Sequence, residues 1–146
     1  MVAYNFPFEM AEAIVAGRKA SCLKPHGKRE HVAEGGTVTA FVGNVAPDYG
    51  RSPDCHRLLD AVCTRSEPVF VNEIGLAMRG RWMTNPEFLR VLAEGEGYVR
   101  FGDLQFALRQ RGPWPWQGQY IRWNASEPSF RAEWPLVSKP PPEPPP

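Results

Sequence analysis

The sequence lacks a long hydrophobic run and is poor in cysteine. A bilayer-spanning helix needs about 20 consecutive apolar residues, and no stretch of this 146-residue chain comes near that length. The segment from Met1 to Met10 contains Glu9 but no basic residue, which is not typical of a signal peptide. The three cysteines are an odd number without metal-binding spacing. These absences predict a reduced, cytoplasmic protein with no membrane partner, no metal and no cofactor.

The chain also lacks an excess of charge of either sign, because its formal net charge is +1. Basic residues are nevertheless concentrated between residues 18 and 31, where five of them accompany a single acid, Glu30. A local basic segment on a nearly neutral protein is typical of a surface that binds phosphate groups. A solvated basic loop without a partner is the alternative. The candidate nucleic-acid-binding residues are Arg18, Lys19, Lys24, Lys28 and Arg29.

Composition separates a body from a tail. Hydrophobic residues make up 42% of the chain, which is typical of a globular protein, and the length suits one domain. Eight of the 16 prolines lie between Pro128 and Pro146, and a proline run has few amide donors with which to join a sheet. We therefore expect one domain in residues 1–124 and a proline-rich tail in residues 125–146. Disorder is favoured for the tail, with a ligand for an SH3-like groove as the alternative.

Local patterns in the body predict an α+β domain with a curved sheet or small barrel. Stop and cap signals favour helices at 8–17, 85–93 and 102–111, the second of them capped by Thr84. β-branched and alternating segments favour extended structure at 19–23, 37–42, 55–66, 69–71 and 119–123. Pro68 is expected to interrupt the long strand, and residues 74–83 are expected to form a hairpin turning at Arg79 and Gly80. Residues 44–54 have the composition of a surface loop.

Several segments, taken in order, resemble the ASCH domain family of the PUA-like superfamily. The sequence AGRK at residues 16–19 is close to the family's G-x-K-x-x-x-x-R signature, with Lys24 in the place of the arginine. The segment EGGTVTAFVG at residues 34–43 resembles the family's glycine turn and second strand, and residues 55–69 resemble the long strand that follows. Residues 94–123 resemble the family's final turn, helix and strand. The resemblance covers residues 2–124.

The resemblance implies a PUA-like fold, which is a small mixed β-barrel flanked by helices, with a cleft beside the first helix. PUA-like domains commonly bind RNA or modified nucleobases. Some ASCH members are similar to amidohydrolases that remove an acetyl group from acetylcytidine, and at least one resembles a ribonuclease acting on single-stranded RNA. By position, the lysine, threonine and glutamate of the amidohydrolase site correspond to Lys19, Cys22 and Glu96 of this chain. Cysteine for threonine and Lys24 for arginine are departures from the family pattern.

Lys19, Cys22 and Glu96 are the candidate catalytic residues. A neutral Lys19 amine could act as a base or nucleophile, whereas a charged, exposed Lys19 would contact phosphate and its removal would leave the fold intact. A Cys22 thiolate could replace the threonine as nucleophile, or the thiol could be a buried packing group. Glu96 could accept a proton, hold Lys19 or be an ordinary loop carboxylate. If the resemblance is functional, Lys19 and Glu96 should share one cleft wall, with Cys22 or Lys24 facing the same space.

The tryptophans near the end of the body leave two roles open. Trp114, Trp116 and Trp123 lie just before and at the end of the last expected strand, where they could stack on unpaired bases or fill the end of the barrel. The predicted function is binding of single-stranded RNA or a modified nucleoside through a basic cleft. The alternative is a hydrolase that uses Lys19 and Glu96, assisted by Cys22 or Ser21. A third class is an interaction module that recruits a partner through the proline tail.

Overall fold

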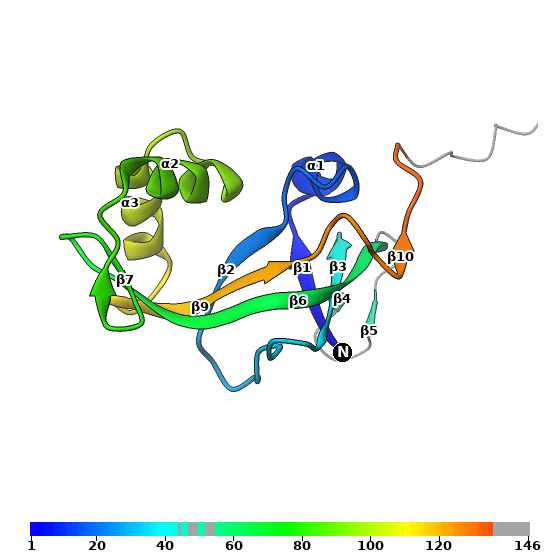
Figure 1. Cartoon of the computed structure of the whole chain (residues 1–146), viewed down its shortest axis with the longest axis horizontal. Helices are drawn as coiled ribbons and strands as arrows, with labels where there is room; N and C mark the ends of the chain where they lie inside the picture. Colours follow the sequence, from blue (N-terminus) through cyan, green and yellow to red (C-terminus); the bar gives the residue numbers. More distant parts are fainter. Residues whose placement is uncertain (44, 47–49, 52–54, 136–146) are drawn as a thin grey trace, which may run out of the picture.

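The computed structural model describes residues 1–43, 45–46, 50–51 and 55–135. A curled mixed sheet is flanked by α1 near one end and by α2 and α3 near the other (Figure 1). The helices are the 3-10 helix η1 (Phe8–Met10), α1 (Ala11–Val15), α2 (Pro86–Gly95) and α3 (Phe101–Arg111). The strands are β1 (Val2–Phe6), β2 (Ser21–Pro25), β3 (Thr37–Val42), β4 (Val45–Ala46), β5 (Gly50–Arg51), β6 (His56–Val71), β7 (Leu76–Met78), β8 (Arg81–Trp82), β9 (Trp116–Trp123) and β10 (Phe130–Arg131).

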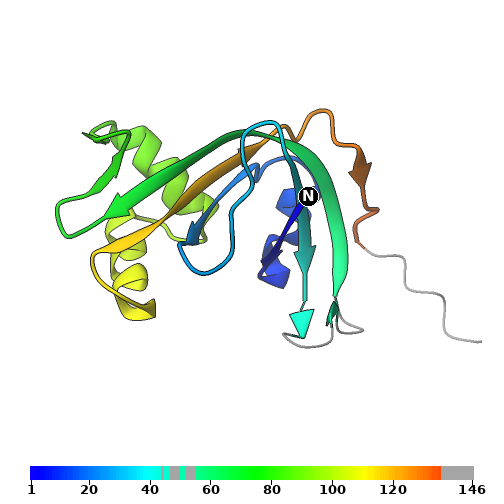
Figure 2. The ribbon, with the colours of Figure 1, turned by 90° about the horizontal axis from the view of Figure 1, so that it is seen from below.

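The long strand β6 connects the two parts of the sheet. The first half of β6 pairs with β3, which pairs in parallel with β1. The second half pairs with β9, and β9 pairs with β2. β1 and β2 are therefore outer strands of a sheet that curls (Figure 2). The Lys24 side chain of β2 reaches the Asn5 carbonyl oxygen of β1. This curled half-barrel with helices beside it confirms the predicted α+β domain with a curved sheet.

Each part of the sheet has its own hydrophobic core. The first core buries Ile14 of α1 with side chains of β1, β3 and β6, and it includes Trp123. The second core lies between α2, α3 and the other part of the sheet, where Leu104 and Leu108 pack with Trp116. Trp116 and Trp123 therefore have the packing role that the sequence left open.

The strand expected to break at Pro68 is continuous, which corrects the prediction. The Asn72 N–H bonds back to Gly75 O on the β7 side of β6. Because alternate residues of a strand present their backbone groups to the same edge, Pro68 faces that edge too. β7 begins to pair only at Val69, so the missing amide hydrogen of Pro68 costs no hydrogen bond of the ladder.

The helix ends also differ from expectation. The predicted helix at 8–17 is divided into η1 and α1. Asn85, rather than Thr84, caps α2, because its Oδ1 accepts the N–H groups of Glu87 and Phe88 at 3.0 and 3.3 Å. α3 and the β7–β8 hairpin match the prediction, and the two turn residues, 79 and 80, have the positive φ angles of a tight hairpin turn.

Residues beyond position 124 still contact the body. β10 pairs with β6, and Arg131 donates to the carbonyl oxygen of Val15. The Trp134 ring lies edge-on to Phe8, with 5.4 Å between the ring centroids. Residues 136–146, which contain the proline run of the predicted tail, lie outside the described residues. So do residues 44, 47–49 and 52–54 of the predicted surface loop, in which β4 and β5 form a short ladder.

Candidate functional site

Lys19 and Glu96 lie side by side, although they come from distant parts of the chain. Lys19 lies between α1 and β2, and Glu96 is the first residue after α2. Their Nζ and Oε1 atoms are 3.7 Å apart. They meet because the end of α2 lies against the beginning of β2, where hydrogen bonds join the two segments. The structure thus brings together the two residues that the sequence analysis placed in one site.

Lys19 is buried, and two of its three donors form hydrogen bonds. Only 5% of its side chain is exposed, and the ammonium donates to the carbonyl oxygens of Ser21, at 2.8 Å, and Gly95. Glu96 Oε1 lies 3.7 Å from Nζ, which makes it an ion-pair partner beyond hydrogen-bond distance. Gly95 ends α2, where unpaired helix carbonyl groups favour a cation. Burial therefore excludes the exposed, phosphate-contacting Lys19 that was one of the two alternatives from the sequence, and the contacts of Lys19 hold it beside Glu96.

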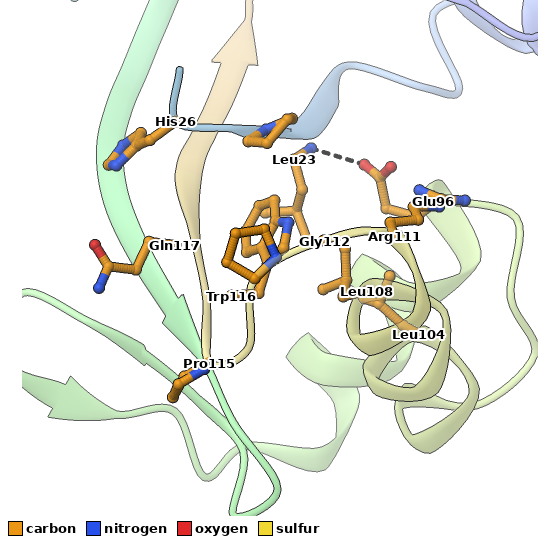
Figure 3. Close-up of a pocket in the computed structure, with 12 residues that line it drawn as sticks. Leu23, His26, Glu96, Leu104, Leu108, Arg111, Gly112, Pro115, Trp116 and Gln117 are labelled. Carbon is orange, nitrogen blue, oxygen red and sulfur yellow. Dashed lines mark hydrogen bonds between the residues drawn. The ribbon is translucent and has the colours of Figure 1, made fainter. Parts of the chain in front are cut away.

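Glu96 has one occupied and one open carboxylate oxygen. Oε1 accepts the Leu23 N–H at 2.8 Å (Figure 3), and it forms the ion pair with Lys19. Within the part of the chain that the structure describes, Oε2 has no hydrogen-bond partner. Because a backbone amide and an ammonium fix the carboxylate, Oε2 is held in a defined position and can accept an N–H group from a ligand.

A cavity of about 380 Å³, here called the α3 cavity, lies next to Glu96 (Figure 3). It is bounded by β2, by α3 and by the start of β9. Leu104, Leu108 and Trp116 give it an apolar lining, while Glu96 and Arg111 supply charge. Apolar cavities of this size with a few fixed polar groups are typical sites for small ligands.

The sequence analysis did not identify Arg111 or His26 as residues of a shared cavity. Arg111 is the last residue of α3 and donates to the Tyr98 hydroxyl at 2.7 Å. His26 follows β2, and its Nε2 is 3.0 Å from Gln119 Oε1. A positive residue at a helix end, followed by glycine, proline and two tryptophans, was the available signal for Arg111. Nothing local to His26 placed it near α3.

Cys22 does not line this cavity. It is 1% exposed and packs in the first core with Trp123, whereas its neighbour Leu23 packs in the second core and lines the α3 cavity. Adjacent residues of a strand face opposite sides, which separates the two. Burial raises the pKa of the Cys22 thiol to about 12. Such a thiol is protonated near neutral pH, so its placement supports the packing role rather than the nucleophile.

Lys24 and Arg29, two of the predicted nucleic-acid-binding residues, contact the outer edge of β1. Lys24 donates to Asn5 O at 2.9 Å, and its Nζ lies 4.5 Å from the centre of the Phe6 ring. Arg29 donates to Ala3 O. Burial lowers the pKa of Lys24 below its ordinary value. These cations bind backbone oxygens of β1, so Lys24 does not face the same space as Glu96 in the α3 cavity.

The remaining predicted contacts, Arg18 and Lys28, differ from each other. Arg18 is exposed and forms an ion pair with Glu12 at 2.9 Å. Lys28 is exposed and has no ion pair with any described residue. The basic segment is therefore partly neutralised or committed to β1, and it does not form one continuous cationic surface.

Comparison of the chain with protein-family models, with curated proteins and with solved structures found no match. Among the described residues, no group of three or more histidine, cysteine, aspartate or glutamate side chains is arranged to hold a metal ion. No helix in the described ranges has the length and apolar character needed to cross a membrane.

Proposed function

We propose that this protein binds single-stranded RNA or a modified nucleoside, and that one base occupies the α3 cavity. In this proposal the curled half-barrel is a PUA-like fold of the ASCH family, as the sequence resemblance implies. The observation that supports the proposal best is Glu96, which lines a largely apolar cavity and whose Oε2 has no hydrogen-bond partner among the described residues. We also propose that the protein is located in the cytoplasm, as the sequence analysis predicts.

The chemistry of the α3 cavity suits a nucleobase. A base has apolar faces, which would lie against Leu108 and Trp116, and polar N–H groups on its edge. A glutamate carboxylate accepts the exocyclic amine of cytosine, and Oε2 has no described partner that would compete for such a donor. Because Leu23 and Lys19 already hold Glu96 in place, binding requires little reordering of this side chain.

Arg111 gives the site a second point of recognition. Its side chain lines both the α3 cavity and a neighbouring cavity of about 620 Å³. A guanidinium offers several donors in a plane and binds phosphate oxygens well. A nucleotide whose base contacts Glu96 would therefore have its phosphate within the region that Arg111 lines.

A hydrolase that uses Lys19 and Glu96 is the second candidate, and the 3.7 Å approach of these two side chains is the observation that favours it. Catalysis would require the Lys19 ammonium to leave one of its carbonyl partners, Ser21 O or Gly95 O. It would also require a nucleophile other than the buried Cys22 thiol. Binding without turnover needs neither rearrangement and is the primary proposal.

Calorimetric titration with cytidine, acetylcytidine and a single-stranded RNA tests the proposal. Glu96→Gln replaces the open oxygen with an amide donor or a neutral acceptor, and a lost hydrogen bond to a charged group costs about 1.5–3 kcal/mol. We expect about a 10- to 100-fold weaker affinity for the nucleoside. The loss for RNA should be smaller, because removing a negative charge near phosphates partly offsets it.

Glu87→Gln is the matched control, because Glu87 is an exposed glutamate at the start of α2 that does not line the cavity. It should bind like the natural protein. Failure of the natural protein to bind any of the three ligands would refute the proposal. Formation of cytidine from acetylcytidine, or of shorter RNA, would instead favour the hydrolase.

A further inference from the structure

We infer that a single-stranded RNA held at the α3 cavity lays its phosphate backbone along a groove lined by Arg18, Arg65 and Arg122. These three residues are called the arginine groove. The inference rests on the proposed function, and it names the part of the surface that would distinguish an RNA strand from a free nucleoside. None of Lys24, Lys28 or Arg29 belongs to this groove.

A series of neighbouring cavities connects the α3 cavity to the arginine groove. The 620 Å³ cavity shares Glu96 and Arg111 with the α3 cavity. A third cavity, of about 240 Å³, shares Arg18 and Ser21 with the second. A fourth, of about 540 Å³, shares Arg122 with the third. These cavities therefore follow one another along the surface beside β2 and the end of β9. The two strands are neighbours in the sheet (Figure 1).

The third and fourth cavities have a cationic lining. Their described lining residues include Arg18, Arg65 and Arg122 and no aspartate or glutamate. Arg122 is exposed and has no ion pair with any described residue. Arg65 is paired with Glu67, but this one carboxylate also pairs with Arg79. Arg18 is paired with Glu12, so the positive charge of the groove that no described carboxylate neutralises lies mainly at Arg122 and Arg65.

The position of Arg122 carries an electrostatic cost. Arg122 on β9 is the direct cross-strand partner of Arg65 on β6, and both side chains line the fourth cavity. Like charges in directly opposed positions of antiparallel strands destabilise a sheet. An anion bound between the two guanidinium groups would remove this repulsion, and a phosphodiester offers oxygens for both of them.

Aromatic side chains accompany the arginines. Phe88 and Tyr120 line the third cavity with ring centroids 6.3 Å apart, and the Arg65 guanidinium lies 5.5 Å from the Tyr120 ring. Tyr120 is buried in the second core, so the half-buried Phe88 ring and the guanidinium of Arg65 are the surfaces on which a base would stack. Nucleic-acid bases stack on aromatic rings and on guanidinium planes. Repeated cations with aromatic surfaces, continuing from a cavity of suitable size for a base, favour an RNA strand over an acidic peptide.

The test compares Arg122→Ala and Arg122→Lys with Arg81→Ala, using a labelled 12-nucleotide single-stranded RNA and free cytidine. Arg81 is an exposed arginine on β8 that lines none of the cavities of this series. Arg122→Ala should weaken RNA binding and lower the slope of log affinity against log salt by about 0.7, the value for one phosphate contact on a single strand. Arg122→Lys should keep the slope. Cytidine binding should be unchanged in all three variants.

The outcomes separate the groove from the proposed function. If cytidine binds but Arg122→Ala leaves the RNA salt slope at its natural value, the groove is wrong and the base cavity stands. If RNA binding depends on Arg122 but cytidine does not bind, the groove stands and the base cavity is wrong. Displacement of the RNA by polyglutamate or by inorganic phosphate at equal charge concentration would overturn the specificity for a nucleic-acid backbone.

Discussion

Replacing Lys19 with methionine should destabilise the protein strongly, because methionine keeps an apolar stem but removes the ammonium. Two acceptors, Ser21 O and Gly95 O, would lose their donor, and Glu96 would lose its ion-pair partner. Removing one member of a buried ion pair costs about 3–5 kcal/mol. The Glu96 side chain is 17% exposed and keeps its bond from the Leu23 N–H, so the lower end of this range applies. We expect a loss of about 3 kcal/mol.

For a chain of this size that loss corresponds to a melting temperature lower by about 6–12 °C. Thermal and urea unfolding followed by circular dichroism would measure it. Lys28→Met is the matched control, since Lys28 is exposed without an ion pair among the described residues, and it should change stability by less than about 0.5 kcal/mol. A double-mutant cycle with Glu96→Gln isolates the coupling between the two side chains. A Lys19→Met protein that melts within about 2 °C of the natural one would refute the role of these contacts.

Three further outcomes follow from single features of the fold. The pKa of the Cys22 thiol is raised to about 12, so roughly one ten-thousandth of it is thiolate at pH 8. Cys22 should therefore resist iodoacetamide at this pH and react only after the protein unfolds. Rapid labelling of the native protein would contradict the burial of Cys22. Burial lowers the pKa of His31, so as the pH falls the unfolded chain takes up this proton before the folded protein does. The stability that neutral His31 contributes is therefore present above about pH 6.5 and is lost as the pH falls below it. The drop in melting temperature from pH 7.5 to pH 5.5 should therefore be smaller in His31→Gln, and an equal drop would contradict this. A chain ending at Asn124 should melt several degrees below one ending at Pro135, because it lacks β10 and the Trp134 contact; equal melting temperatures would show that these contacts do not stabilise the body.

The elements predicted correctly are those whose signals are local. β3 has β-branched residues in alternation, α3 ends where glycine follows, and the hairpin turn has Gly80 at a position with positive φ. β1 was not among the predicted strands. It also alternates, with Tyr4 and Phe6 buried and Asn5 exposed, but its five residues contain no strong turn signal at either end. Its place beside β3 depends on a parallel pairing across more than 30 residues, which local propensity does not encode.

The candidate site also combines features that the sequence predicted with features that depend on tertiary packing. The family resemblance paired Lys19 with Glu96, and the structure brings them together. Burial of Lys19 could not be predicted, because its acceptor Gly95 O becomes a neighbour only when α2 packs on β2. The α3 cavity depends likewise on tertiary packing, since Arg111 and Trp116 lie on different elements. Residue type suggested which residues to consider, and the packing of the helices decides which of them line the α3 cavity.

The outer edge of β1 has a consequence for self-association. An outer strand with unpaired carbonyl groups can accept a strand from another molecule and begin aggregation. Lys24 and Arg29 occupy the carbonyl oxygens of Asn5 and Ala3 from within the same chain. Their charges also make the approach of a second copy unfavourable. The basic segment therefore covers an outer sheet edge, and substitutions that neutralise both residues would be expected to turn this edge into a template for intermolecular β-pairing.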